Sequence, residues 1–359
     1  MPKRTIIPFG PQHPVLPEPI HLDLAIRDEK VVEAIPSLGF IHRGLELLVD
    51  KKDFNDMAFV AERICGICSF IHGQGYCQGI EEIMNVQIPD RAKYLRTIWA
   101  ELSRIHSHIL WLGLAADAAG FESLFMHSWR VREKILDIFE ETTGGRVIFG
   151  VNKVGGVKKN IENDVLERIV RTLKDMEAEF KPLANVFIDD YSIKHRFSNV
   201  GMLSKEDAYK LGAVGPVLRG SGVSIDMRKI GYAAYKELNF EPIVENSCDC
   251  YARTIVRVRE VYQSVDLIKQ AVDKIPEGPI DQKVTGFPNG EFFSRLEQPR
   301  GEVVYYMRGN GTKNLDRYRV RTPTFANIAP LVKMLEGCDL ADVPVIILTI
   351  DPCISCTER

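Results

Sequence analysis

The sequence lacks the features that would place the chain across a membrane or on nucleic acid. No run reaches the roughly 18 apolar residues of a membrane helix, since ILWLGLAADAAG is interrupted and VPVIILTI is short. The N-terminal MPKRTIIPFGPQHP is basic but broken by prolines, so we expect no secretory signal. The net charge of −3 and the absence of a long Lys/Arg block argue against a nucleic-acid partner.

Cysteine is also sparse, with 8 residues among 359. Cys65 and Cys68 form one Cys-x-x-Cys pair, and Cys353 and Cys356 form another near the end of the chain. The other four lie outside these pairs and are Cys77, Cys248, Cys250 and Cys338. Without an export signal we expect reduced thiols, so the pairs favour metal or redox chemistry over disulfides. We expect no iron–sulfur cluster within this chain, because no cysteines with cluster spacing are left over.

The hydrophobic patterns predict a mainly α (α+β) protein, with one domain over residues 1–359 and a central helical bundle. Alternating apolar residues around an RDEK turn predict a β-hairpin within residues 1–40. Apolar spacing of three and four residues predicts a helical body over residues 41–280. A GNGTKN turn predicts a second β-hairpin within residues 281–359, which end in the second cysteine pair.

Breakers and caps predict individual elements. A helix is expected over residues 44–63, and another begins at residue 163 and closes near Pro182. Residues 89–118 carry a long apolar stripe that predicts a buried or amphipathic helix. The run VPVIILTI, residues 343–350, is expected to be a buried strand that leads into the second cysteine pair.

Two cysteines at positions i and i+3 point the same way and can bind one metal ion. Four thiolates make a soft site, which favours zinc, iron–sulfur or nickel over magnesium and calcium. Zinc ribbons separate their pairs by roughly 15–20 residues, whereas these pairs lie at opposite ends of the chain. That separation favours a metal in the middle of a large fold, although a structural zinc site stays open. No βαβ pattern surrounds either pair, which disfavours a thioredoxin-like redox motif.

The residues around the two pairs carry a specific resemblance. RICGICSFIH resembles the Arg-x-Cys-Gly-x-Cys-x-x-x-His signature of nickel–iron hydrogenase large subunits, and DPCISCTER resembles their C-terminal Asp-Pro-Cys-x-x-Cys signature. GPQHPV, GFIHRGLE, GPVLRGSGVSIDMR, DCYAR and YRVRTPTFANIA are similar to segments of the quinone-site subunit of respiratory complex I. That subunit lacks the four cysteines. The combination resembles group 4 energy-converting (Ech-type) hydrogenases.

This resemblance implies the nickel–iron hydrogenase large-subunit fold and reversible H2 oxidation or proton reduction at a nickel–iron centre. Cys65 and Cys353 would be terminal ligands of nickel, and Cys68 and Cys356 would bridge to an iron that carries carbon monoxide and cyanide. Electrons would pass through a small iron–sulfur subunit, with ferredoxin as the redox partner. Further iron–sulfur and integral-membrane subunits would couple the reaction to ion translocation, which places the chain peripherally on the cytoplasmic side of the cell membrane.

The matching segments also imply roles for other side chains. Glu46 would relay protons from a terminal cysteine, and Arg300 would lie over the metals near the cyanides. His72 would hydrogen-bond a bridging thiolate, and Asp351 would pair with Arg300 or cap nearby backbone amides. Three further residues are assigned to the surroundings of the site and are Arg63, Pro299 and Asp117. The alternative is a complex I-like quinone or electron-transfer subunit, or a scaffold whose four cysteines hold structural zinc.

Overall fold

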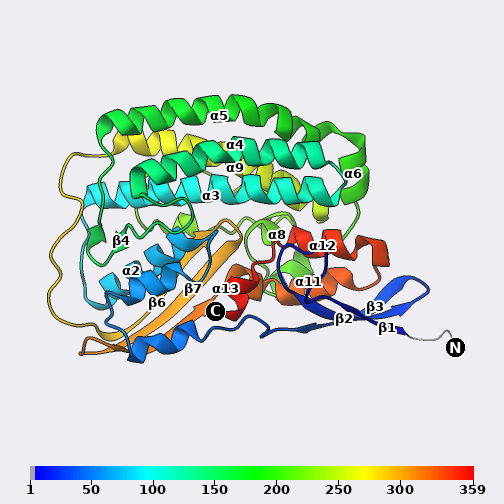
Figure 1. Cartoon of the computed structure of the whole chain (residues 1–359), viewed down its shortest axis with the longest axis horizontal. Coiled ribbons are helices and arrows are strands. Elements are labelled where there is room, and N and C mark those ends of the chain that lie inside the picture. The colour runs from blue at the N-terminus through cyan, green and yellow to red at the C-terminus, as the bar shows by residue number, and fades with distance from the viewer. Residues whose placement is uncertain (1–4) are drawn as a thin grey trace.

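The structure, a computed structural model, describes residues 5–359. Four long helices lie side by side and form one layer of the molecule (Figure 1). These helices are α3 (Asp90–Ala118), α4 (Glu122–Thr143), α5 (Asn163–Asp189) and α9 (Cys250–Lys274). Helix α3 is almost wholly buried because α4 and α9 both pack against it. Helix α4 ends where Gly144 adopts the left-handed conformation, φ 83°, which glycine tolerates without steric penalty.

Two three-stranded antiparallel sheets lie below this helical layer (Figure 1). The first contains β1 (Thr5–Phe9), β2 (His21–Arg27) and β3 (Lys30–Ser37), in that order. The second contains β6 (Asn289–Gln298), β7 (Gly301–Asn310) and β8 (Leu315–Arg321). Both predicted hairpins are confirmed as β2–β3 and β7–β8, and each gains one strand, β1 or β6, that was not predicted. A small β4–β5 pair spans residues 152–157.

Helix α2 (Ser69–Ile83) begins directly after the first cysteine pair and packs on the second sheet. Its glycines permit this close contact. A Cβ atom at Gly75 would lie 2.3 Å from the Tyr305 ring, and one at Gly79 would lie 1.9 Å from the end of Met307. Glycines that look like helix breakers therefore bring α2 onto the sheet and fix the start of α2 beside the turn between β6 and β7.

The remaining helices are short. They are η1 (Leu45–Asp50), α1 (Met57–Glu62), α6 (Tyr191–Phe197), α7 (Lys205–Lys210), α8 (Gly215–Arg219), η2 (Met227–Ile230), η3 (Tyr235–Glu237), α10 (Pro323–Ala326), α11 (Ile328–Leu335), η4 (Leu340–Asp342), α12 (Val343–Thr349) and α13 (Ile354–Glu358). Helices α12 and α13 bracket the first cysteine of the second pair, Cys353.

Three predicted elements are wrong. Residues 343–349 form helix α12 rather than a strand, because a short, fully buried apolar run does not reveal its own period. The helix predicted over residues 44–63 is divided into η1 and α1 by a turn. Helix α5 continues through Pro182 to Asp189; the proline ring is exposed, so the break in the hydrogen-bond ladder faces solvent.

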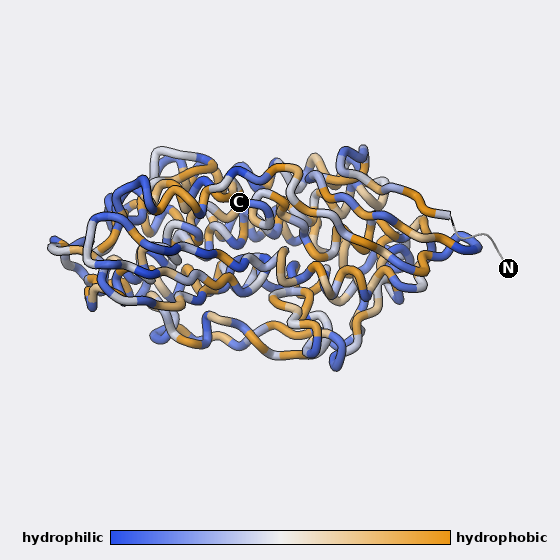
Figure 2. The backbone as a smooth tube through the Cα atoms, turned by 90° about the horizontal axis from the view of Figure 1, so that it is seen from below, coloured by the Kyte–Doolittle hydropathy of each residue, from blue (hydrophilic) through white to orange (hydrophobic). Residues whose placement is uncertain are grey.

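The C-terminus lies in the middle of the elongated molecule in both views (Figure 1 and Figure 2). Polar and apolar residues alternate along most of the tube in Figure 2, as amphipathic elements require. Within residues 5–359, no helix is both long enough and apolar enough to cross a bilayer. The fold therefore brings the last residues of the chain to its centre, where the first cysteine pair also lies.

Candidate metal centre

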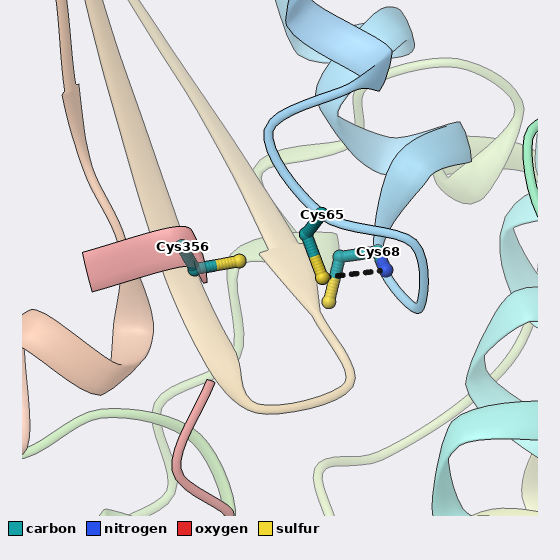
Figure 3. Close-up of side chains that lie close together, drawn as sticks. All are labelled: Cys65, Cys68 and Cys356. Atoms are coloured by element: carbon teal, nitrogen blue, oxygen red, sulfur yellow. Dashed lines mark hydrogen bonds between the residues drawn. The ribbon is translucent and has the colours of Figure 1, made fainter. Parts of the chain in front are cut away.

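The two cysteine pairs meet in one buried cluster, which we call the thiol cluster (Cys65, Cys68, Cys353 and Cys356). The sulfurs of Cys65 and Cys353 are 3.3 Å apart. Those of Cys65, Cys68 and Cys356 lie within 4.8 Å of one another and point into a common space (Figure 3). All four cysteines are buried. The two distant motifs therefore meet at one buried position, and their role as metal ligands stays a prediction.

Local backbone geometry aims each pair into the cluster. Cys68 is the N-cap residue of α2, and its N–H donates to the sulfur of Cys65 at 3.4 Å. On the other side, Asp351 adopts a left-handed conformation, φ 54°, which turns the chain as it leaves α12. The N–H of Cys353 then donates to the Thr324 hydroxyl at 3.1 Å. Helix α13 carries Cys356 one turn further on.

The segment after β3 holds α13 in place. The Glu358 carboxylate accepts hydrogen bonds from the backbone N–H groups of Gly39 and Ile41, at 2.6 and 2.5 Å. The Arg43 guanidinium donates to the Ser355 carbonyl at 3.0 Å. Residues from both ends of the chain thus close the thiol cluster together.

Arg300 contacts the cluster from the turn between β6 and β7. Its Nη1 lies 3.2 Å from the Cys68 sulfur, its Nη2 is 2.8 Å from the Asp351 carboxylate, and its Nε donates to the Asp351 carbonyl. Burial alone would lower the pKa of Arg300, but the charges of Asp351 and of the Cys68 thiolate outweigh burial and raise it well above its usual value. A fixed positive charge therefore faces the thiols.

His72 contacts the cluster from α2. Its Nε2 lies 3.3 Å from the Cys356 sulfur and 3.2 Å from the Gln298 amide nitrogen, and its Nδ1 is 2.8 Å from the Tyr305 hydroxyl. Burial, together with the nearby charges of Arg359 and Arg300, lowers the pKa of His72 to about 3. The imidazole is therefore neutral and held between a sulfur and a phenol.

In the folded chain Glu46 lies beside the C-terminal residue Arg359, and two ion pairs hold its carboxylate. Its carboxylate is 2.5 Å from Arg319 Nη1 and 2.8 Å from Arg359 Nε, and it also accepts from the Val320 N–H. Burial alone would raise the pKa of Glu46, but these hydrogen bonds and charges bring it below its usual value. The proton-relay role of Glu46 stays a prediction. In this structure Glu46 forms an ion pair with the C-terminal arginine, Arg359.

Glu18 has no predicted role, but the structure brings it to the second cysteine pair. Its carboxylate accepts from the backbone N–H groups of Ile354 and Ser355, which lie between Cys353 and Cys356. Burial, and then the charge of Cys353, raise the pKa of Glu18 to about 8. Glu18 lies in a loop between two prolines, with no spacing relation to the cysteines, so only the fold reveals it.

The remaining expected residues have different surroundings. Pro299 is buried beside Arg300 in the turn between β6 and β7. The Arg63 side chain is 54% exposed and donates to the Phe59 carbonyl, although Arg63 closely precedes the first cysteine pair in the sequence. Asp117 is exposed and lies ten residues after Ser107, which contacts Arg300. Ten residues are about 15 Å along a helix, so α3 does not bring Asp117 into the cluster.

The donor set fits a soft metal ion. Hydrogen bonds from the thiols of Cys356 and Cys65 lower the pKa of Cys68 well below its usual value, and Arg300 adds to this effect. One carboxylate oxygen of Asp351 has no hydrogen-bond partner among the described residues. Four converging sulfurs, a facing cation and an unfilled acceptor match a thiolate-bound metal centre better than a packed apolar core.

A second buried polar region, which we call the ion cluster, joins α3 and α9 to β6 and the segment around η2. Its members are Glu101, Arg104, Arg219, Asp226, Arg228, Glu260 and Glu297, all of them buried. Arg219 bridges Glu260 and Glu297, at 2.7 Å each, and Arg228 bridges Asp226 and Glu101. His108 Nε2 donates to the Glu260 carboxylate at 2.8 Å, which makes His108 part of this structural network.

Two protein-family models match parts of this chain. The family model described as respiratory-chain NADH dehydrogenase, 49 Kd subunit, matches residues 118–287 and 282–359. The model described as nickel-dependent hydrogenase matches residues 43–114, which contain the first cysteine pair. The fold and site thus define a large subunit of the class shared by nickel-dependent hydrogenases and respiratory NADH dehydrogenases.

Individual relatives narrow this class. The membrane-bound hydrogenase subunit alpha of Pyrococcus furiosus is 36% identical over 98% of this chain and 87% of its own length. The carbon monoxide-induced hydrogenase of Rhodospirillum rubrum is 37% identical over 98% of this chain and 99% of its own. A chain of the membrane-bound sulfane sulfur reductase, an archaeal respiratory membrane complex, superimposes with a TM-score of 0.94 at 29% identity, over 99% of this chain and 98% of that one. The chain belongs to the family of membrane-bound hydrogenase large subunits and complex I 49 kDa subunits.

Proposed function

We propose that the chain is the catalytic large subunit of an energy-converting nickel–iron hydrogenase of the Ech type, which interconverts H2 with protons and electrons. The observation that carries this proposal is the thiol cluster itself, in which both ends of the chain supply sulfurs to one buried position. The nickel-dependent hydrogenase model matches the segment with the first pair, and two hydrogenases are similar to the chain along nearly its whole length.

A nickel–iron centre, with carbon monoxide and cyanide on the iron, would supply the site at which H2 is split or formed. Cys65 and Cys353 would be its terminal thiolates, and Cys68 and Cys356 would bridge the two metals. Thiolates bind soft metals strongly, and a terminal thiolate can accept a proton when H2 is cleaved heterolytically. The chain thus provides both the ligands and the first proton acceptor.

The side chains around the sulfurs would adjust their charge and position. Arg300 donates toward Cys68 and would offset the negative charge of thiolates and cyanides. The neutral His72 would hold the Cys356 sulfur in one orientation. Glu18, whose carboxylate lies against the loop between Cys353 and Cys356, is better positioned than Glu46 to take a proton from Cys353, because Glu46 is engaged by two arginines.

The proposed partners follow from the family. A small iron–sulfur subunit would carry electrons between the buried centre and ferredoxin, and further iron–sulfur and integral-membrane subunits would couple the reaction to ion translocation. The printed names of the relatives and of the similar solved structure refer to membrane-bound enzymes and an archaeal respiratory membrane complex, which supports a membrane partner. The chain would then be peripheral, on the cytoplasmic side.

A second candidate is an electron-transfer or quinone-type subunit whose four cysteines hold zinc. It is favoured by the match of residues 118–287 and 282–359 to the 49 kDa subunit family, and by the likeness to a sulfur reductase. This candidate predicts no H2 chemistry at all, which separates it from the first.

The test is H2-dependent reduction of a viologen dye by the purified complex, with H2/D2O exchange measured in parallel. We expect both activities in the wild type and their loss in Cys353→Ser, because serine cannot replace a terminal thiolate. Cys338→Ser is the matched control, since Cys338 lies outside the thiol cluster and is half-buried. Full H2 activity in Cys353→Ser, or none in the wild type, would contradict the proposal.

A further inference from the structure

A cavity of about 600 Å³ opens between α2, the start of α3 and the segment around residues 231–237. Polar and charged side chains dominate its wall, among them Gln74, Gln78, Lys93 and Glu237. A cavity of this size and polarity holds many water molecules. It lies outside the thiol cluster, and the resemblance gives it no role.

Gln74 is an unusual part of this wall. The residue is fully buried, yet neither its amide nitrogen nor its amide oxygen has a hydrogen-bond partner within residues 5–359. Leaving a buried polar group unpaired is costly, so native proteins satisfy such groups with ordered water where no protein partner is in reach. Water in the adjoining cavity is the partner that the position of Gln74 offers.

The wall of the same cavity comes close to the metal centre through Tyr232. The Glu297 N–H donates to the Tyr232 hydroxyl oxygen at 3.1 Å. The next residue, Gln298, has its amide nitrogen 3.2 Å from His72 Nε2, which is 3.3 Å from the Cys356 sulfur. Only one residue of β6 therefore separates the cavity wall from a hydrogen-bonded line that ends at the thiol cluster.

The interface between α2 and β6 contains more unpaired polar atoms. The amide oxygen of Gln298 and the hydroxyl of Ser294 are both buried without a partner in the described part of the chain. These residues are four apart on one strand, so their side chains lie on the same face of β6. Ser294 lies under Gly79 of α2, and Gln298 contacts His72 at the start of α2. Gly75 and Gly79 keep the middle of α2 in direct contact with the sheet, so the water that satisfies these groups lies beside this contact, toward Gln74 and Gln298.

We propose that ordered water joins Gln74 to Gln298 and makes this cavity a proton route between solvent and the Cys356 side of the metal centre. The inference rests on the proposed function. Each H2 that is oxidised releases two protons and two electrons; the electrons leave to the iron–sulfur partner, and protons pass along the hydrogen-bonded line. Gln74 is a positioning residue in this scheme, because it orients water rather than touching the reacting atoms. The route is separate from Glu18, which lies beside the other cysteine of the second pair.

The test compares Gln74→Leu with Gln78→Leu in the purified, metal-loaded complex. Both side chains line the cavity one helical turn apart, but Gln78 is half-buried and outside the group of unpaired atoms. We expect Gln74→Leu to slow H2/D2O exchange on the order of tenfold and to raise the solvent isotope effect, because an apolar side chain interrupts the water line. Gln78→Leu should stay within about twofold of the wild type, and Gln74→Glu, which keeps polar oxygens, should recover most of the loss.

Two further measurements distinguish failure of the proton route from failure of the proposed hydrogenase function. Infrared bands and metal content should be unchanged in Gln74→Leu; if they are unchanged and exchange is as fast as in the wild type, the route is wrong while the proposed function stands. A high-resolution structure of the complex should show water bonded to Gln74 and to the Gln298 amide oxygen, and a dry interface would overturn the inference whatever metal is bound. A complex without a nickel–iron centre would overturn the proposed function and the proton role together.

Discussion

The ion cluster and the thiol cluster are both buried and polar, but they differ in how completely their groups are paired. In the ion cluster, Arg219 and Arg228 each lie between two carboxylates. In the thiol cluster, the sulfurs contact one another, and an oxygen of Asp351 has no partner among the described residues. Paired charges in the ion cluster hold α3, α9 and β6 together, whereas an unpartnered oxygen beside converging sulfurs indicates a missing ligand. The same burial therefore has a structural meaning in one region and a functional meaning in the other.

The largest effect is expected from breaking the ion cluster. Arg228→Met leaves Asp226 and Glu101 without their shared cation in the protein interior. Removing one partner of a buried ion pair costs about 3–5 kcal/mol, because the other charge stays desolvated. Urea denaturation should show a loss of this size. Arg295→Met is the control, since the Arg295 side chain is 48% exposed and its partner Glu302 keeps Arg321 nearby, so the loss should be less than about 1 kcal/mol. Equal losses in the two variants would show that the cluster is not a special source of stability.

Glu62, close to the first cysteine pair, is a buried carboxylate that is poorly paired. Its closest cation, Arg63, is 3.8 Å away, and burial raises the pKa of Glu62 from 4.5 to about 7. Because the folded state holds this proton more tightly, the stability that it contributes is present below about pH 4.5 and is lost as the pH rises through 7. Glu62→Gln keeps an acceptor for the Gly150 N–H and should be more stable than the wild type by about 3 kcal/mol at pH 8, with little difference at pH 4.5. Parallel stability curves from pH 4.5 to 8 would contradict this reading.

Glu18 and Glu46 differ in the same way: Glu46 is paired with two arginines, whereas Glu18 accepts hydrogen bonds from backbone N–H groups. Glu18→Gln removes a carboxylate that lies against the Cys353–Cys356 loop and has no hydrogen bond from an arginine among residues 5–359. We expect its H2/D2O exchange to fall about 100-fold, the lower range for loss of a general acid–base group. Glu46→Gln weakens two ion pairs and should mainly loosen the C-terminal residues, with exchange reduced only several-fold. The reverse order of the two effects would restore Glu46 as the relay.

A smaller effect is expected from Arg300→Lys. Lysine keeps the positive charge but loses the fixed fork that reaches both Asp351 and the Cys68 sulfur. H2-dependent dye reduction should drop about tenfold while nickel remains bound, because partners of metal ligands tune the site more than they hold it. Asp351→Asn is the companion variant; asparagine tolerates the left-handed backbone at this position. Unchanged activity in Arg300→Lys would show that a positive charge at this position supports activity without the guanidinium geometry.

The sequence predicted the site residues that belong to local motifs better than those that reach the site only through long-range folding. The two cysteine pairs, His72 and Arg300 converge as expected, because local motifs aim each side chain from a fixed turn or helix start. Glu18 was missed because it reaches the site only through long-range folding of a proline-rich loop. Asp117 was assigned to the site, but it is exposed near the end of α3. Helical spacing predicts which face of a helix a residue lies on, but not how far along the helix the site lies.

The fold shows the same limit. Alternation and three- to four-residue spacing identified the β2–β3 hairpin and helix α3. The run at residues 343–350 carried no period, since nearly every residue in it is apolar, and it proved to be helix α12. Strands β1 and β6 were also missed, although the other edge strands of the same two sheets, β3 and β8, were predicted. Local patterns therefore predict elements, and packing decides the rest.

The most direct test of the central claim is the metal content of the purified complex. If the thiol cluster is one nickel–iron site, mass spectrometry of the metals will find nickel bound through this chain in a ratio of about one per chain. Infrared spectra will show bands of metal-bound carbon monoxide and cyanide, and Cys65→Ser will lose both the nickel and the bands. Zinc in place of nickel, with no such bands, would contradict the account.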